Sequence, residues 1–175
     1  MNKNIKNNDI LIIKELLTDK YYNSTFRINP FILNNDNYGN LCIDQNKLDK
    51  IKNNLINKKY VKKNSNICIF RNMHYNCETK NIIQKNILDI KHNKCGMIII
   101  SKDKKLESDS FPIINKYHKE FTKTIVSYKI NSIILSLITE SNKYNYVELQ
   151  FKFNQQNKIT SILKDLQFIY SSLLN

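Results

Sequence analysis

Two short pairs of histidine and cysteine carry the clearest chemistry in the sequence. His74 and Cys77 form one H-x₂-C pair, and His92 and Cys95 form a second pair after 14 intervening residues. Imidazole nitrogen and thiolate sulfur are typical ligands of structural zinc, which binds four of them in a tetrahedron. The spacing therefore predicts one zinc ion held by these four residues. The alternative is a metal-free chain in which the histidines are ordinary surface residues and the cysteines are small buried ones.

The second pair also resembles a known family. The run His92-Asn-Lys-Cys95-Gly96-Met97-Ile98-Ile99 is similar to the second knuckle of the zinc ribbons in transcription factor IIB and related proteins, where a ligand pair precedes glycine and apolar residues. A basic helical segment ahead of a ribbon resembles the larger subunit of transcription factor IIE. The resemblance implies a zinc ribbon over residues 67–100 with an architectural metal, in a transcription accessory factor without catalytic residues.

The residues before these pairs predict a basic helical region. Residues 9–21 place apolar side chains at helical spacing, and the proline at the start of 29–33 favours a short helix. Asp44 is a typical N-cap for a helix over residues 45–57. Three helices and a basic hairpin are the order of a winged helix, which contacts DNA through its third helix. The residues predicted to contact nucleic acid are Lys47, Lys50, Asn54, Lys62, Lys63 and Arg71. An ordinary amphipathic helix with a solvated face is the alternative.

A polar stretch over residues 101–110 marks the predicted boundary between a region at 1–100 and a second region at 111–175. In the second region, residues 133–139 and 146–153 are expected to form a hairpin. The later strand alternates, with an apolar face that a helix over residues 158–174 should cover; that face consists of Val147, Leu149, Phe151 and Phe153. The expected fold class is α+β: a basic, winged-helix N-terminal half, a zinc ribbon, and a small antiparallel sheet closed by the C-terminal helix.

The composition limits the function classes. The chain has only two glycines, which excludes the glycine-rich phosphate loops and the nucleophile elbow of hydrolases. Its 28 Lys and Arg against 15 Asp and Glu give a formal net charge of +13, which attracts nucleic acid. Lysine, asparagine and isoleucine all use A/T-rich codons, and they number 26, 28 and 28. Part of the positive charge is therefore expected to reflect codon bias.

The expected location is inside a cell, in the nucleus or cytoplasm. No apolar run is long enough for a membrane span, and Lys14 and Glu15 interrupt the apolar stretch that a signal peptide would need. The four cysteines are therefore expected to be thiols or metal ligands. The expected partners are DNA or RNA and the proteins of a larger complex, with no membrane.

Two other functions compete with the transcription factor. One is a scaffolding subunit that holds partners through the C-terminal sheet without a metal. The other is a Mg²⁺-dependent nuclease, because Glu140 followed by Gln150-Phe151-Lys152 resembles the core of restriction-endonuclease-like enzymes. There a carboxylate holds the metal and a lysine stabilises charge at the phosphate.

Overall fold

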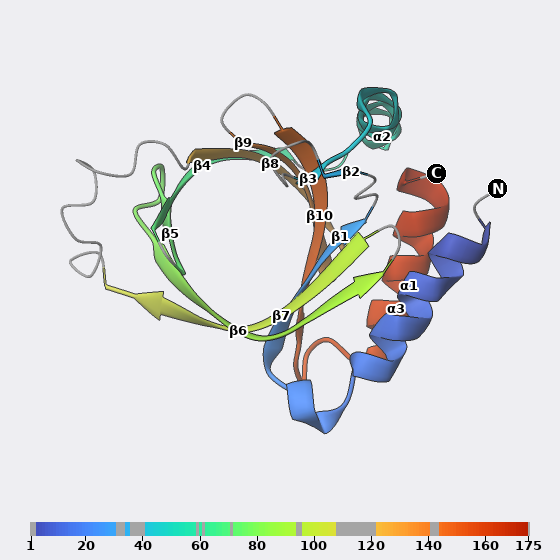
Figure 1. Cartoon of the computed structure of the whole chain (residues 1–175), viewed down its shortest axis with the longest axis horizontal. Helices are drawn as coiled ribbons and strands as arrows, with labels where there is room; N and C mark the ends of the chain where they lie inside the picture. Colours follow the sequence, from blue (N-terminus) through green and yellow to red (C-terminus); the bar gives the residue numbers. More distant parts are fainter. Residues whose placement is uncertain are drawn as a thin grey trace.

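A closed barrel of eight strands forms the body of the protein in the computed structural model (Figure 1). Around the barrel the strands follow the order β1-β10-β9-β8-β4-β5-β6-β7, and every neighbouring pair is antiparallel. The structure describes residues 3–30, 34–35, 41–58, 60, 62–70, 72–93, 96–107, 122–140 and 144–174. Closure leaves no barrel strand with an unpaired edge, and this removes the usual site of edge-to-edge aggregation.

The barrel strands come from almost the whole length of the chain. They are β1 (Ser24–Pro30), β4 (Lys62–Phe70), β5 (Met73–Asn76), β6 (Ile82–Asn93), β7 (Gly96–Leu106), β8 (Thr122–Ile130), β9 (Ile133–Glu140) and β10 (Tyr144–Phe153). The helical elements are α1 (Lys3–Leu16), η1 (Asp19–Tyr21), α2 (Gln45–Asn57), α3 (Ile159–Phe168) and η4 (Ile169–Leu173), and a separate short ribbon pairs β2 (Asn34–Asn35) with β3 (Leu41–Cys42).

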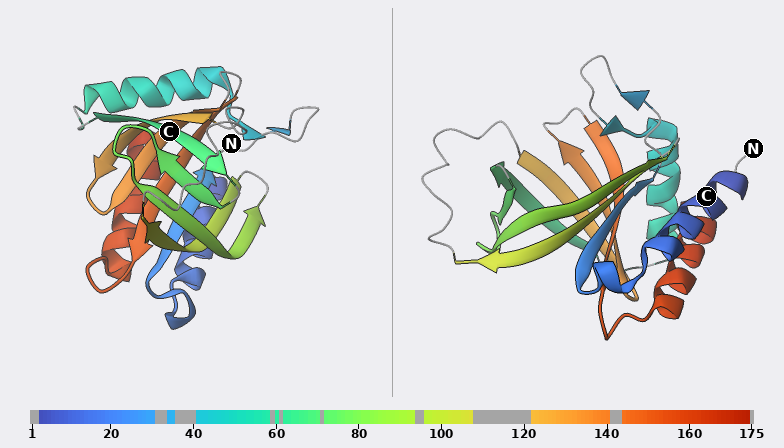
Figure 2. Two further views of the ribbon diagram at one scale, coloured as in Figure 1. Left: turned by 90° about the vertical axis from the view of Figure 1, so that its left-hand side faces the viewer. Right: turned by 60° about the horizontal axis from the view of Figure 1, so that its bottom comes forward.

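The hydrophobic core lies outside the barrel, between its wall and the helices. Helices α1, α2 and α3 gather on one side, and β5 lies on the side away from them (Figures 1 and 2). Phe26 on β1 stacks on Phe151 of β10 with ring centroids 5.1 Å apart, and both belong to one cluster with apolar residues of all three helices. The helices therefore bury the outward face of the strands they cover.

A β-bulge interrupts the long hairpin of β6 and β7 between Ile87 and Asp89. The extra residue shifts the alternation of β6, so that Asp89 pairs with the outward-facing Ile100. There the Tyr21 hydroxyl donates a 2.6 Å hydrogen bond to the Asp89 carboxylate. The bulge thus moves one carboxylate from the inside of the barrel to its outer surface.

Several elements are where the sequence predicts them. The helix over residues 45–57 is α2, and the Asp44 side chain accepts a 3.4 Å hydrogen bond from the backbone N–H of Asn46. The predicted C-terminal hairpin is β9 and β10, and the predicted last helix is α3 with η4. The predicted apolar face of β10 is buried in the core, as expected for Val147, Leu149, Phe151 and Phe153.

The predicted fold class is wrong. The described strands form a closed antiparallel barrel, the described residues contain neither a winged helix nor a zinc ribbon, and β4 after α2 is a barrel strand instead of a wing. The polar stretch predicted as a boundary begins inside β7. In the sequence it resembles a linker because this part of the strand is accessible on both faces and carries polar residues on both. Strands from both sides of that boundary complete one barrel. In place of a short helix at 29–33, residues 29 and 30 end β1, and 31–33 lie outside the described residues.

Among the described residues, no helix has the length and apolar character that crossing a membrane requires.

We expect Phe151→Ala to lower the free energy of unfolding by about 3–5 kcal/mol, because it removes a buried ring from the cluster between barrel and helices. Urea unfolding monitored by circular dichroism measures this loss. Lys152→Ala is the matched control, because Lys152 is the exposed neighbour on the opposite face of β10 and should change stability little. Equal losses in the two variants would contradict the assignment of the two faces.

Candidate functional site inside the barrel

The strand register fixes which side chains face the barrel interior. Phe26 and Ile28 of β1 face the helices, so the residues that alternate with them, Thr25, Arg27 and Asn29, face inward. All seven residues of β1 are buried, which shows that both faces of this strand are covered. Partners opposite each other across a strand pair share a face, and the inward face can therefore be followed around the barrel from β1.

Arg27 is the centre of the inward-facing polar residues. Its side chain donates hydrogen bonds from Nη1 to the Ser101 hydroxyl at 2.8 Å and from Nη2 to an Asp103 oxygen at 2.6 Å. On the other side, Nε lies 3.9 Å from a Glu148 oxygen and has no hydrogen-bond partner within the described part of the chain. Arg27 is only 4% exposed. A buried guanidinium thus joins β1 to β7 and β10 and keeps one N–H without a hydrogen bond.

Positive charge dominates the inward face of the described strands. By register, and among the side chains that the structure describes, seven inward positions are basic and two are acidic; they are Arg27, Lys63, Lys85, Lys105, Lys123, Lys129 and Lys152 against Asp103 and Glu148. Hydrogen bonds connect some of these groups, since Lys123 Nζ donates to the Tyr146 hydroxyl at 2.7 Å. The excess of positive charge favours an anion inside the barrel.

The pKa of Lys85 is lowered by its surroundings. This pKa falls to about 8, mainly because of burial and next because of the charge of Arg27; Lys123 lowers it as well, whereas Glu148 and Asp103 raise it. Lys85 is therefore protonated at neutral pH, although burial and the neighbouring cations disfavour its positive charge. A bound anion would relieve that repulsion and strengthen the protonated form.

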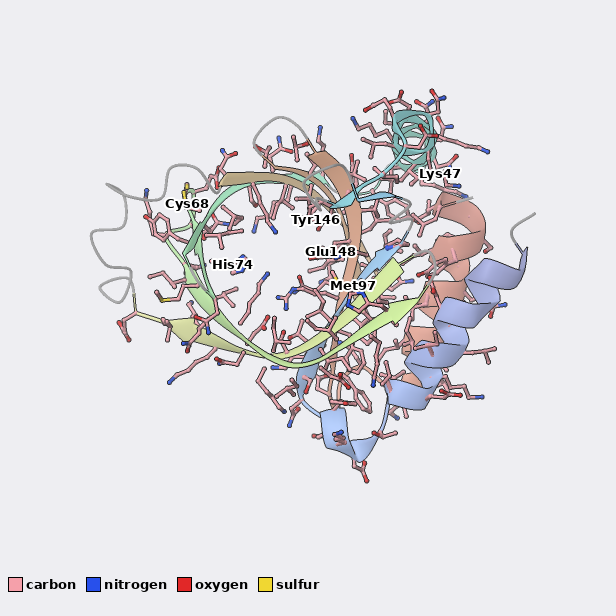
Figure 3. The ribbon with its side chains drawn as sticks, viewed as in Figure 1. Lys47, Cys68, His74, Met97, Tyr146 and Glu148 are labelled. Atoms are coloured by element: carbon pink, nitrogen blue, oxygen red, sulfur yellow. The ribbon has the colours of Figure 1, made fainter. Side chains whose placement is uncertain are left out.

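His74 also points into the barrel, toward the side that carries Tyr146 and Glu148 (Figure 3). Burial is the main cause that lowers its pKa to about 2, and the charges of Lys85, Lys123 and Arg27 lower it as well. The imidazole is therefore neutral in the folded protein. A neutral ring beside three cations can accept or donate a hydrogen bond without adding to the positive charge.

The pKa of Asp103 reflects its strong interaction with Arg27. Burial alone would raise the pKa of this carboxyl, but the hydrogen bond and charge of Arg27 outweigh burial and hold it below its usual value. The Ser101 hydroxyl donates a further 2.8 Å hydrogen bond to Asp103. Both terminal nitrogens of Arg27 donate to Asp103, at 3.3 Å and 2.6 Å, so this carboxylate fixes the orientation of the guanidinium and leaves Nε–H as the donor without a hydrogen bond in the described residues.

The structure separates the residues predicted to bind zinc. His74 on β5 pairs with Ile83 of β6. His92 lies nine positions beyond Ile83 on β6, which corresponds to about 30 Å at the rise of an extended strand. Cys77 contacts Cys68 through sulfur atoms 3.3 Å apart, and Cys95 lies outside the described residues. Burial and the Cys68 contact raise the pKa of Cys77 to about 11, which disfavours the thiolate that zinc needs. Whether the chain binds zinc stays a prediction that metal analysis can test.

The residues predicted to contact nucleic acid are spread over two surfaces. Lys47, Lys50 and Asn54 belong to α2 on the outside of the barrel, and the Asn54 amide donates a 3.0 Å hydrogen bond to the Leu173 carbonyl of η4. On β4, Lys63 faces inward and Lys62 outward, while Arg71 lies outside the described residues. Contact of nucleic acid with these residues stays a prediction, but they do not form one recognition surface.

Sequence reasoning missed Arg27, the central residue of the inward face. One signal was available: Arg27 is one of only two arginines among 28 basic residues, and it sits in the alternating strand Ser24–Pro30. Neither partner could be found in this way, because Asp103 lies 76 positions away and Glu148 further still.

No family model matches the sequence, and no curated protein matches it either. The fold is similar to that of the S. pombe Pct1 RNA triphosphatase, with a TM-score of 0.52 and 12% identity over 97% of this chain and 85% of that one. A second structure, of S. pombe Pct1 in complex with the Spt5 CTD, gives a TM-score of 0.54 and 10% identity over 95% of this chain and 89% of that chain. At such identity the likeness shows a shared fold.

These similarities correct the functional predictions from the sequence. The resemblance to zinc-ribbon transcription factors is wrong, because the chain forms a closed eight-stranded barrel that is similar in fold to the Pct1 structures, and no group of three metal-ligating side chains occurs among the described residues. The prediction of a zinc-containing, non-catalytic transcription accessory factor is therefore wrong as well. The nuclease alternative relied on Glu140 lying near Gln150 and Lys152, but the register of β9 and β10 pairs Glu140 with Tyr144 and Gln150 with Ile134, at the other end of the hairpin. The scaffolding alternative placed partners on the C-terminal sheet, and the strands of that sheet are part of the closed barrel.

We expect acid to destabilise the protein through His74. An unfolded chain binds a proton at His74 below its usual pKa of 6.5, whereas the folded protein does not until about pH 2. Stability is therefore present above pH 6.5 and falls as the pH drops, by about 2 kcal/mol at pH 5. Urea unfolding at pH 7 and pH 5 should show this loss in the wild type and a smaller loss in His74→Gln. His92→Gln keeps His74 and should behave like the wild type; the same acid sensitivity in all three proteins would contradict the prediction.

Proposed function

We propose that the barrel interior binds the triphosphate at the 5′ end of an RNA. The observation that carries this proposal is the group of inward-facing cations around Arg27. The fold shared with an RNA triphosphatase supports an RNA end as the source of the phosphates. The fold alone would not identify a ligand, and the charges alone would fit several polyanions.

The arrangement divides the work of phosphate binding between two kinds of group. Arg27 is fixed by Asp103 and Ser101, so its guanidinium presents oriented donors at little entropic cost. Lys85 and Lys123 provide point charges that adapt to the oxygens of a flexible phosphate chain. Each charge-assisted hydrogen bond to phosphate contributes about 1.5–3 kcal/mol. In this proposal Arg27, Lys85 and Lys123 supply the positive charge that holds the triphosphate.

Hydrolysis of the terminal phosphate is a second candidate function. It is favoured by Glu148, which faces the interior of the barrel (Figure 3) and has an oxygen 3.9 Å from Nε of Arg27. A carboxylate at this position could orient a water molecule for attack on phosphorus, and the surrounding cations would stabilise the charge of the transition state.

A protein partner and a place in the cell follow from the same proposal. The Pct1 structure with the Spt5 CTD shows that one protein of this fold binds another protein's segment. We propose a protein partner for this chain on that basis, and a nuclear or cytoplasmic location where capped or uncapped RNA ends occur.

A comparison of two RNAs that differ only in their 5′ ends tests the first function. An RNA with a 5′-triphosphate should bind more tightly than the same sequence with a 5′-hydroxyl, measured by competition in fluorescence anisotropy. Lys85→Met should weaken triphosphate binding by about 10-fold or more, because a charge-assisted contact is lost. The affinity of the wild type should also fall above pH 8, as Lys85 loses its proton.

Lys164→Met is the matched control, since Lys164 is an exposed lysine of α3 and the change removes the same charge. Equal affinity for the two RNAs, or equal weakening by both substitutions, would show that general positive charge is responsible and would overturn the proposal.

Release of phosphate from the triphosphate RNA tests the second function. If Glu148 orients the attacking water, the wild type releases phosphate and Glu148→Gln reduces the rate at least 100-fold while triphosphate binding persists. The assay is run with and without magnesium or manganese. Tight triphosphate binding without phosphate release under any of these conditions would reject hydrolysis and leave the binding function intact.

A further inference from the structure

Two thiols meet on the outer surface of the barrel at the corner of β4 and β5. The sulfur atoms of Cys68 and Cys77 are 3.3 Å apart, and both residues are half-buried. Cys68 lies on β4 opposite Tyr75, and Cys77 follows β5 two residues beyond Tyr75, so the two thiols are diagonal neighbours on one face. Figure 3 shows Cys68 pointing away from the interior in which His74 lies.

Hydrogen bonds hold the segment that carries Cys77. Its backbone N–H donates to the Asn66 carbonyl at 2.9 Å. In the adjoining turn, the Asn76 side-chain oxygen accepts hydrogen bonds of 3.0 Å from the N–H groups of Glu78 and Thr79. The Glu78 carboxylate in turn accepts a 2.9 Å hydrogen bond from the Asn66 N–H. The backbone therefore holds the two thiols in contact, and the sulfur atoms must close from 3.3 Å to the bond length of about 2.05 Å.

The barrel wall is least supported at this corner. β5 has four residues, and its register extends over four pairs with β4 and three pairs with β6. No described helix covers β5, because the helices lie on the other side of the barrel (Figure 1). A covalent link between β4 and the end of β5 would strengthen the shortest strand of the wall.

We propose that Cys68 and Cys77 are a thiol–disulfide site, which forms an intramolecular disulfide with a low-molecular-weight disulfide such as oxidised glutathione. One thiolate attacks the glutathione disulfide and releases one reduced glutathione. The second thiol then displaces the other glutathione from the mixed disulfide. In total, two S–H bonds and one S–S bond break, one protein S–S bond forms, and the two electrons and two protons pass to two reduced glutathione molecules. The bond would reinforce the wall beside His74, independently of whether the interior binds RNA.

Oxidation of the full-length protein tests this site. In a Cys42→Ser/Cys95→Ser background, which leaves only Cys68 and Cys77, oxidised glutathione should remove both free thiols and lower the mass by 2 Da relative to the reduced protein. Peptide mapping should then find Cys68 linked to Cys77. Closing a loop of this size should raise the thermal unfolding midpoint by about 5 °C, and reduction with dithiothreitol should reverse the shift.

Variants with one thiol provide the control. Adding Cys68→Ser or Cys77→Ser to the same background should leave one thiol, which can only accumulate as a stable glutathione adduct. Such an adduct on the parent protein, two thiols that stay free, or a bond only between separate chains would each overturn the proposal. The mass and mapping of the parent protein do not depend on whether a serine variant folds.

Discussion

The pairing of β1 with both β7 and β10 is the contact on which the rest of the structure depends. These two ladders close the barrel, since without β1 the sheet would end in two open edges. Arg27 reinforces the closure from inside, because its guanidinium reaches Asp103 of β7 and lies near Glu148 of β10. The strand that closes the wall thus also supplies the central charge of the interior, and a substitution at Arg27 would act on both.

The distribution of polarity follows from that closure. A wall of single strands has two faces, and here the helices bury only the outer face on one side of the barrel. The main cluster of apolar residues therefore lies outside the wall, and the inward face holds charged groups together with isoleucines such as Ile90 and Ile99. This explains how a chain with 41% hydrophobic residues and a net charge of +13 can form a stable structure with cations at its centre.

Local signals in the sequence were sufficient for individual elements and insufficient for their assembly. The N-cap at Asp44 and the alternation from Val147 to Phe153 depend on neighbouring residues, and both predictions are confirmed. Closure depends on contacts such as Arg27 with Asp103, 76 positions apart, which no periodicity reveals. The H-x₂-C pairs also show the limit of local spacing: the spacing suits a tight hairpin, whereas the first pair lies at the end of β5 and the second begins at the far end of β6.

The bulge in β6 makes the inward faces differ at the two ends of the β6–β7 hairpin. Beyond it, the inward positions of β6 are Ile90 and His92, next to Met97 and Ile99 of β7, whereas before it Lys85 faces inward beside Asp103. One inserted residue therefore makes this hairpin vectorial: its inward side is largely aliphatic beyond the bulge and carries the pair of Lys85 and Asp103 before it. A ligand that lay along the hairpin with a charged head and a less polar body would have one favourable orientation, and its reversal would place the head among isoleucines. The direction of such a ligand is thus encoded in the count of residues along a single strand.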